Sequence, residues 1–203
     1  MSGPLDLNDP VAVLLAVARA LRAHRLQHAA YGGLALAAYG EPRETKDADL
    51  AVAGFEAEHA LDALRAAGFE ASLAFAGVRF GGHRVSRFTL FPGGGQTGLN
   101  TADLVEPISS RYAREALSRA QEGRLRGEVT RVLTPEDFVL FKVLSTRERD
   151  LDDAASVIRA QGADFDRELV TREADRLAAE VPDHDTAARL RIALERASRG
   201  GVP

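Results

Sequence analysis

Two aspartates one residue apart, Asp47 and Asp49, begin a run that otherwise has the pattern of a buried strand. Because successive strand side chains point to opposite faces, we expect both carboxylates on one face, with Ala48 and Leu50 facing the core. Neighbouring carboxylates repel each other, and partial burial increases the repulsion. A divalent cation such as magnesium, which prefers oxygen ligands and phosphate, would relieve it. The alternative is a strand entry at which both aspartates face solvent.

The residues just before this pair extend the pattern. Gly32 and Gly33 follow a short apolar segment, roughly residues 29–31, and precede an apolar helix pattern. Backbone amides at a strand-to-helix turn, with no Cβ in the way, can bind an anion, although a glycine pair alone is more often only a turn. Combined with the aspartates, the segment predicts a phosphate-binding loop beside a metal site. Its other polar members are Arg43, Thr45 and Lys46.

Two later segments add charged residues to this pattern. Asp103 falls in a later strand. It could be a third metal ligand, a base for an attacking hydroxyl, or simply an acidic residue on an edge strand. Lys142 falls on an otherwise apolar helix, where a lysine either extends to water or binds a specific anion. Arg147, Asp150 and Asp153 follow at helical spacing and can pair with each other or with Lys142. The same spacing also describes an ordinary set of surface ion pairs.

The chain as a whole predicts a mixed α/β part followed by helices alone. Glycine-rich turns separate several strand patterns, and after residue 107 we expect a short helix, a connector and one more strand. Thr134 and Pro135 have the pattern of a helix N-terminus. We therefore expect an α/β (α+β) fold, with a mixed β-sheet flanked by helices. It would be divided into a core at residues 1–133 and a C-terminal helical domain at residues 134–203.

The composition excludes several classes of protein. The chain has no cysteine, so it can form neither disulfides nor cysteine-based zinc sites, and neither His28 nor His83 has zinc-ligand spacing. The N-terminus lacks a signal-peptide pattern, and no apolar run approaches the roughly 18 residues of a membrane span, so we expect a cytoplasmic location and no membrane partner. A net charge of -4 argues against a globally basic nucleic-acid binder. Five arginines could line a local RNA groove or form ordinary polar faces, namely Arg111, Arg114, Arg124, Arg126 and Arg131.

The order of these motifs resembles the nucleotidyltransferase superfamily of the DNA polymerase β type. The shared pattern is Gly-Gly, a short helix, Arg-x-Thr-x-Asp-x-Asp, a later strand aspartate, and a helical block that begins at Asp137. The helical block most resembles the AbiEii-like group, the toxin side of type IV toxin–antitoxin systems. Aminoglycoside nucleotidyltransferases are similar over the first half. The resemblance spans roughly residues 29–158.

This resemblance implies a metal-dependent nucleotidyltransferase that uses a nucleoside triphosphate (NTP). Magnesium, with two ions expected, would be bound by Asp47, Asp49 and Asp103. Lys142 would meet a phosphate or the base of the nucleotide, and Asp150 and Asp153 would shape the back of the cleft. The implied nucleotide-binding residues are Gly32, Gly33, Arg43, Thr45, Lys46, Arg147 and Asp150.

The resemblance also implies a reaction, in which a nucleoside monophosphate passes from the NTP to an acceptor hydroxyl. RNA, in particular tRNA, would be the acceptor if the chain acts as the AbiEii-like toxins do, and a cognate antitoxin would then be a partner. A small-molecule acceptor, as in the aminoglycoside-type enzymes, is one alternative. A non-catalytic nucleotide-binding relic is the other.

Overall fold

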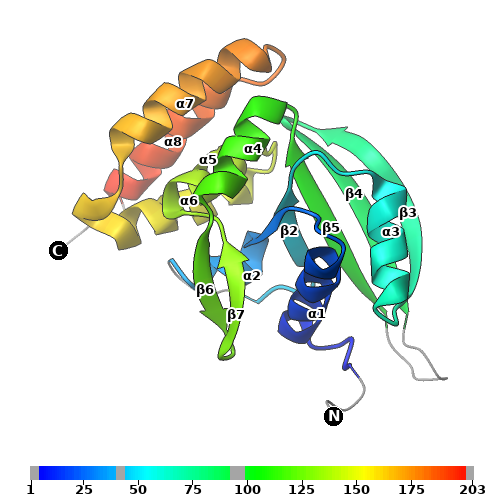
Figure 1. Ribbon diagram of the computed structural model, residues 1–203. Coiled ribbons are helices and arrows are strands. Elements are labelled where there is room, and N and C mark those ends of the chain that lie inside the picture. Colours follow the sequence, from blue (N-terminus) through cyan, green and yellow to red (C-terminus); the bar gives the residue numbers. More distant parts are fainter. Residues whose placement is uncertain (1–4, 40–43, 92–98, 200–203) are drawn as a thin grey trace.

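The computed structural model describes residues 5–39, 44–91 and 99–199, which form a mixed β-sheet flanked by helices (Figure 1). The α/β part contains α1 (Pro10–Ala23), β1 (His28–Tyr31), α2 (Gly32–Leu36), β2 (Ala48–Val52), α3 (Ala57–Ala66), β3 (Glu70–Phe80), β4 (His83–Phe91), β5 (Asn100–Pro107), α4 (Ser110–Arg119), β6 (Gln121–Leu125) and β7 (Glu128–Val132). The helical part contains α5 (Pro135–Leu144), α6 (Glu148–Gln161), a short 3₁₀ turn (Gly162–Asp164), α7 (Arg167–Glu180) and α8 (Thr186–Arg199). The predicted fold class is confirmed.

The sheet has seven strands in the order β3-β4-β5-β2-β1-β7-β6. The pairs β2–β5 and β1–β7 are parallel, and the other pairs are antiparallel. In β2, Ala48 and Leu50 are fully buried, as the alternating pattern predicts. The segment expected to be a connector contains β6, which forms a hairpin with β7.

The start of α5 follows from its capping residues. The Thr134 hydroxyl accepts a hydrogen bond from the Asp137 amide, and Pro135 is the first helical residue, as predicted. The helix then packs on the sheet, because the rings of Phe138 and Phe141 lie 5.7 Å and 5.2 Å from the ring of Tyr31. One hydrophobic cluster includes residues on both sides of position 133. The division into two domains at that position stays a prediction.

Membrane insertion by a helix can be judged for the described segments alone. None of the helices in those segments combines the length and the apolar character needed to cross a bilayer.

Candidate active site

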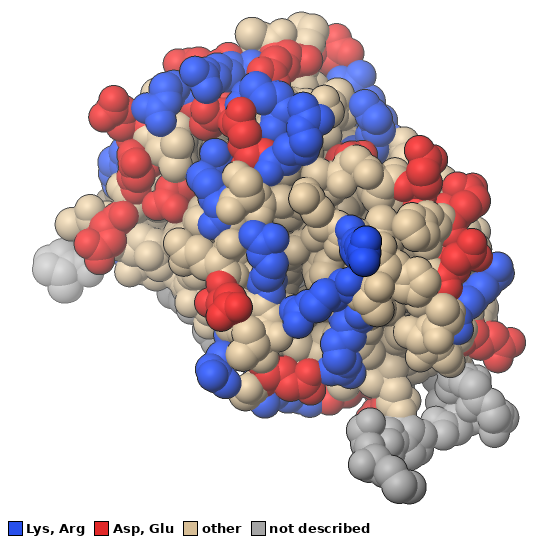
Figure 2. Space-filling model, viewed as in Figure 1, with Lys and Arg blue, Asp and Glu red and all other residues tan. Residues whose placement is uncertain are grey.

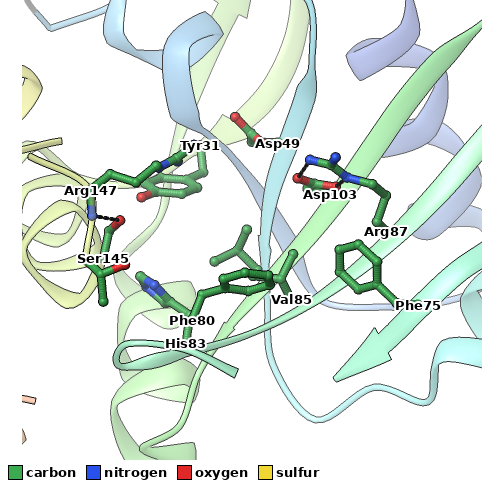
Figure 3. Close-up of a pocket in the computed structure, with 12 residues that line it drawn as sticks. Tyr31, Asp49, Phe75, Phe80, His83, Val85, Arg87, Asp103, Ser145 and Arg147 are labelled. Carbon is green, nitrogen blue, oxygen red and sulfur yellow. Dashed lines mark hydrogen bonds and ion pairs between the residues drawn. The ribbon is translucent and has the colours of Figure 1, made fainter. Parts of the chain in front are cut away.

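One row of side chains crosses five neighbouring strands on a single face of the sheet. The strand register pairs Phe75 with Arg87, Arg87 with Asp103, Asp103 with Asp49, and Asp49 with Tyr31. Side chains paired directly across strands share a face. All five line a cavity of about 300 Å³ (Figure 3). The fold therefore brings two of the three predicted acids to adjacent positions on β5 and β2.

Two parts of the chain supply the rest of the cavity wall. Strands β3, β4 and β5 and the connection between α5 and α6 contribute Phe80, His83, Val85, Val105, Ser145, Thr146 and Arg147. The turn between β3 and β4 is tied to the end of α5, because the Gly82 amide donates to the Leu144 carbonyl at 2.8 Å. Gly81, at a φ of +61°, has the same carbonyl 2.7 Å from the position of an added Cβ. A glycine at this position therefore permits the close contact.

Asp103 is held by an arginine. The Arg87 Nε and Nη2 atoms donate to the two Asp103 carboxylate oxygens at 2.7 Å and 2.6 Å, which is a bidentate pair. This hydrogen bonding outweighs partial burial and raises the pKa of Arg87 above its usual range. The guanidinium carbon also lies 5.8 Å from the centroid of the Phe75 ring. Both Asp103 oxygens are therefore engaged by one guanidinium group.

Asp49 has no such partner. Among the residues that the structure describes, none donates a hydrogen bond to its carboxylate or forms a close ion pair with it. Burial, followed by the charges of Asp103 and Asp47, raises the pKa of Asp49 to about 7. Near neutral pH the cavity therefore contains one carboxyl group that is only partly ionised, and no described residue donates a hydrogen bond to it.

Asp47 is exposed and immediately precedes β2. Its Oδ1 accepts a hydrogen bond from the Thr101 hydroxyl at 3.1 Å. It lines a neighbouring surface hollow together with Lys46, and not the cavity that contains Asp49. Its charge still contributes to the raised pKa of Asp49, so the two carboxylates act on the same region.

The glycine pair has a packing role. Gly32, at the start of α2, has a φ of +71°, and a Cβ added there would lie 2.0 Å from Asp49 Oδ2. A Cβ on Gly33 would lie 2.9 Å from the Cβ of Thr45. Both glycines are buried, and their absent side chains give room to Asp49 and Thr45. Phosphate binding by their amides stays a prediction, and Arg43 lies outside the described residues.

We expect Gly32→Ala to lower the free energy of unfolding more than Gly68→Ala does. Both glycines have a positive φ, which costs about 1–2 kcal/mol for an alanine. The Gly68 position, at φ +92°, has no atom within 4 Å of an added Cβ, whereas the Gly32 position meets the Asp49 carboxylate. Urea unfolding of both variants measures the difference, and equal losses would contradict the close packing of Asp49 on Gly32.

Lys142 lies inside the protein and does not line the cavity. Its Nζ is 2.7 Å from both Asp150 Oδ1 and Asp153 Oδ2, and it lies 5.3 Å from the centroid of the Tyr31 ring. The other Asp150 oxygen accepts from Arg147 Nε at 2.9 Å. Burial opposes the ionisation of Asp150, but Lys142 outweighs it and lowers the pKa of this carboxyl. The predicted pairing is confirmed, while contact of Lys142 or Asp150 with a nucleotide stays a prediction.

Intramolecular contacts are made by Arg111, Arg124, Arg126 and Arg131 of the five arginines considered for an RNA groove. Arg111 pairs with Glu173 and Glu180, and Arg126 pairs with Asp9. Figure 2 shows basic and acidic side chains interleaved over the upper part of the face in view, and mainly basic side chains across its middle. The contacts favour the interpretation of these arginines as polar faces of ordinary elements.

Sequence reasoning did not assign Arg87, Tyr31 or His83 to the site. A signal was present in β4, where His83, Val85 and Arg87 alternate and therefore share one face of the strand. That this face is the face of Asp49 depends on the order of the strands, which the sequence does not specify.

The acidic residues can be tested for a magnesium site. Carboxylate oxygens suit this ion, and Asp49, without a donor and with Asp47 nearby, fits it. Asp103 fits less well because Arg87 engages both of its oxygens. Within residues 5–39, 44–91 and 99–199, no group of three or more histidine, aspartate or glutamate side chains is arranged to hold a metal ion. The geometry thus fits one ion at Asp49 better than two.

Comparison with solved structures identifies the fold. A crystal structure of an antigenic nucleotidyltransferase-like protein from Paracoccidioides brasiliensis aligns over 94% of this chain and 95% of its own, with 21% identity and a TM-score of 0.51. The chain has a nucleotidyltransferase-like fold. The solution structure of the antibiotic-resistance factor ANT(2'')-Ia aligns over 83% of this chain and 93% of its own, with 16% identity and a TM-score of 0.54.

Comparison of the sequence with known families and proteins gives no further evidence beside the fold. No family model matches the chain, and no curated protein matches it. The closeness to the AbiEii-like group stays a prediction.

Proposed function

We propose that this protein transfers a nucleoside monophosphate from an NTP to an acceptor hydroxyl. The observation that carries the proposal is the row Asp49, Asp103 and Arg87 at the cavity. The Asp49 carboxyl, which lacks a hydrogen-bond donor among the described residues, lies there beside a second carboxylate that an arginine holds in a fixed orientation. The nucleotidyltransferase-like fold supports the same chemistry.

Each charged group of the row has a proposed role. Asp49 and Asp47 would hold magnesium, which when bound neutralises charge on the triphosphate. Arg147, whose side chain is 62% exposed at the cavity, would contact phosphate oxygens. The acceptor oxygen would bond to the α-phosphorus as the bond to the departing pyrophosphate breaks. Asp103, oriented by Arg87, would receive the acceptor proton.

The substrates would bind between the proposed core and the proposed helical domain. The cavity supports this, since its wall includes strand residues of the first and the segment Ser145–Arg147 that precedes α6 of the second. Predicted contacts of Gly32, Gly33, Thr45, Lys46 and Lys142 with the nucleotide belong to the same proposal.

Two classes of acceptor are proposed, and each rests on a different similarity to other proteins. RNA or tRNA, with an antitoxin partner, rests on the resemblance of the helical block to AbiEii-like toxins. A small-molecule acceptor is supported by the likeness of the fold to that of an antibiotic-resistance factor. A strongly cationic small molecule would need free acidic groups. Glu106 instead accepts a hydrogen bond from the Gly54 amide at 2.6 Å, and Asp150 is buried between two cations.

We expect Asp47→Ala to lower transfer by about 100-fold or more, the cost of losing one group that stabilises the transition state. Purified protein would receive magnesium and each α-labelled NTP, with total RNA and a panel of aminoglycosides as acceptors. Label on RNA or on a small molecule decides between the two acceptor classes. Asp62→Ala, which removes an exposed carboxylate on α3, is the matched control. Full activity of Asp47→Ala, or transfer that persists after chelation of magnesium, would contradict these roles.

A further inference from the structure

A buried histidine with an unsatisfied ring nitrogen lines the cavity. His83 is 3% exposed, and its Nε2 has no hydrogen-bond partner among the described residues. Its ring lies 5.5 Å from the ring of Phe141, which holds it in place. Figure 3 shows it at the part of the cavity bordered by Ser145 and Phe80. Buried polar atoms normally have partners, so this nitrogen is available to hydrogen-bond a group bound in the cavity.

The protonation state of the His83 imidazole limits which chemical groups can bind beside it. Burial lowers the pKa of His83 to about 3, so the ring is neutral at physiological pH. A neutral imidazole donates one hydrogen bond and accepts another, and it does not attract an anion. The site therefore suits an uncharged hydrogen-bonding group.

His83 lies at the opposite end of the cavity from the charged row. It is four residues from Arg87 on the same face of β4, which is roughly 13 Å along the strand. Between them lie Val85 and Val105, which are paired across β4 and β5. The cavity thus has a charged end and a neutral end, joined by an apolar floor.

Aromatic rings form another part of the wall. The centroids of Phe75 and Phe80 lie 6.2 Å apart, and both rings line the cavity. Phe80 is paired in register with His83, so an apolar ring and the neutral imidazole occur together. Nucleic-acid bases stack on such rings, and base edges carry the donors and acceptors that an imidazole can match.

We propose that the neutral end of the cavity binds the base of the NTP, with a hydrogen bond between the base edge and His83 Nε2. This inference rests on the proposed function, since phosphates at the charged end direct the nucleoside along β4 toward His83. The acceptor would then reach the α-phosphate from a position outside the neutral end of the cavity. His83 would select the nucleotide and take no part in bond making.

The test follows ring signals of the five histidines by NMR in the full chain with magnesium. ATP, GTP, CTP and UTP are added separately, and inorganic tripolyphosphate serves as a ligand without a base. We expect the His83 signal to move with at least one NTP and not with tripolyphosphate, while the Arg87 side-chain signal moves with both. His28 is the matched control, because its Nε2 is also buried without a partner among the described residues, yet it does not line the cavity.

The affinity of histidine variants for NTP and for tripolyphosphate is a second measurement. His83→Phe should weaken binding of the preferred NTP about tenfold, as expected from loss of one hydrogen bond to a neutral group, and leave tripolyphosphate binding unchanged. His28→Phe should change neither affinity. His83→Gln, which retains a donor and an acceptor, should recover part of the loss. If His83→Phe does not fold, the NMR experiment on the wild-type chain decides alone.

Three results would overturn the inference. If NTPs move the Arg87 signal and leave His83 unmoved, the base binds elsewhere and the proposed transfer function survives. If tripolyphosphate moves His83 as much as an NTP does, this end binds phosphate. If no NTP moves either signal, nucleotide does not bind the cavity, and the proposed function fails together with this inference.

Discussion

Replacing Asp49 by asparagine is expected to abolish nucleotide transfer and to make the folded protein more stable than the wild type above pH 7. Asparagine has the shape of aspartate, so it preserves the packing against Gly32. It removes the negative charge on which magnesium binding would depend. It also removes the repulsion from Asp103 and Asp47, which helps to raise the pKa of Asp49.

The sign of the stability change follows from proton linkage. The pKa of Asp49 is about 7 in the folded protein, against an ordinary value of 3.8. Between these values the folded state keeps a proton that the unfolded chain has released, so this group lowers stability as the pH rises from about 4 to about 7. Above pH 7 the wild type carries the full cost, at most a few kcal/mol, and the asparagine variant carries none.

Urea unfolding at pH 4 and at pH 8 measures this effect. The variant should gain stability relative to the wild type at pH 8 and differ little from it at pH 4. Saturating magnesium should reduce the gain at pH 8, because the ion would neutralise Asp49 in the wild type. Asp62→Asn, at an exposed position, should show no such dependence on pH. An asparagine variant that is less stable than the wild type at pH 8 would contradict the proposed electrostatics.

The second large effect is expected for Lys142→Met. Methionine fills similar apolar space but leaves Asp150 and Asp153 facing each other without the ammonium group that contacts both. Breaking a buried ion pair by removing one partner costs about 3–5 kcal/mol. Chemical unfolding at pH 7 should show a loss of this size, and Lys46→Met, at the other lysine of the chain, which is exposed, should show almost none.

Removing the two carboxylates as well should restore most of the loss. A triple variant with Lys142→Met, Asp150→Asn and Asp153→Asn carries none of the three charges that meet in this cluster, so its unfolding free energy should return toward that of the wild type. An unchanged unfolding free energy for Lys142→Met would contradict this structural role of the cluster. A contact of Lys142 with the nucleotide, as in the proposed function, would in addition make the variant bind nucleotide more weakly.

Local pattern was sufficient to predict much of the architecture. Alternation in β2 correctly places Ala48 and Leu50 in the core, and the capping residue Thr134 correctly marks the start of α5. Both features depend on neighbours in the sequence, where steric and hydrogen-bonding rules are strong. The helical spacing of Asp150 and Asp153 left open whether they pair with each other or with Lys142, and the structure has the pairs with Lys142.

Features that depend on strand register could not be predicted. Arg87 meets Asp103 because β4 and β5 pair at those residues, and no short-range pattern fixes that pairing. The full burial of Lys142 depends on α5 packing against Tyr31, more than 100 residues earlier in the chain. The strand β6 was missed because its residues, Gln121–Leu125, are mostly polar and exposed and become a strand only by pairing with β7.

The contact between the β3–β4 turn and the last residue of α5 limits how the cavity can adapt. Gly82 and Leu144 are joined there by a hydrogen bond between backbone atoms, next to His83. Substitution of Val85, Val105 or Phe80 can widen or narrow the cavity, but it leaves this boundary in place. The length of ligand that fits between Arg87 and His83 is therefore set by the main chain. Substitution of the lining side chains would change which ligand ring fits in the cavity. A longer ligand would require a change in the β3–β4 turn itself.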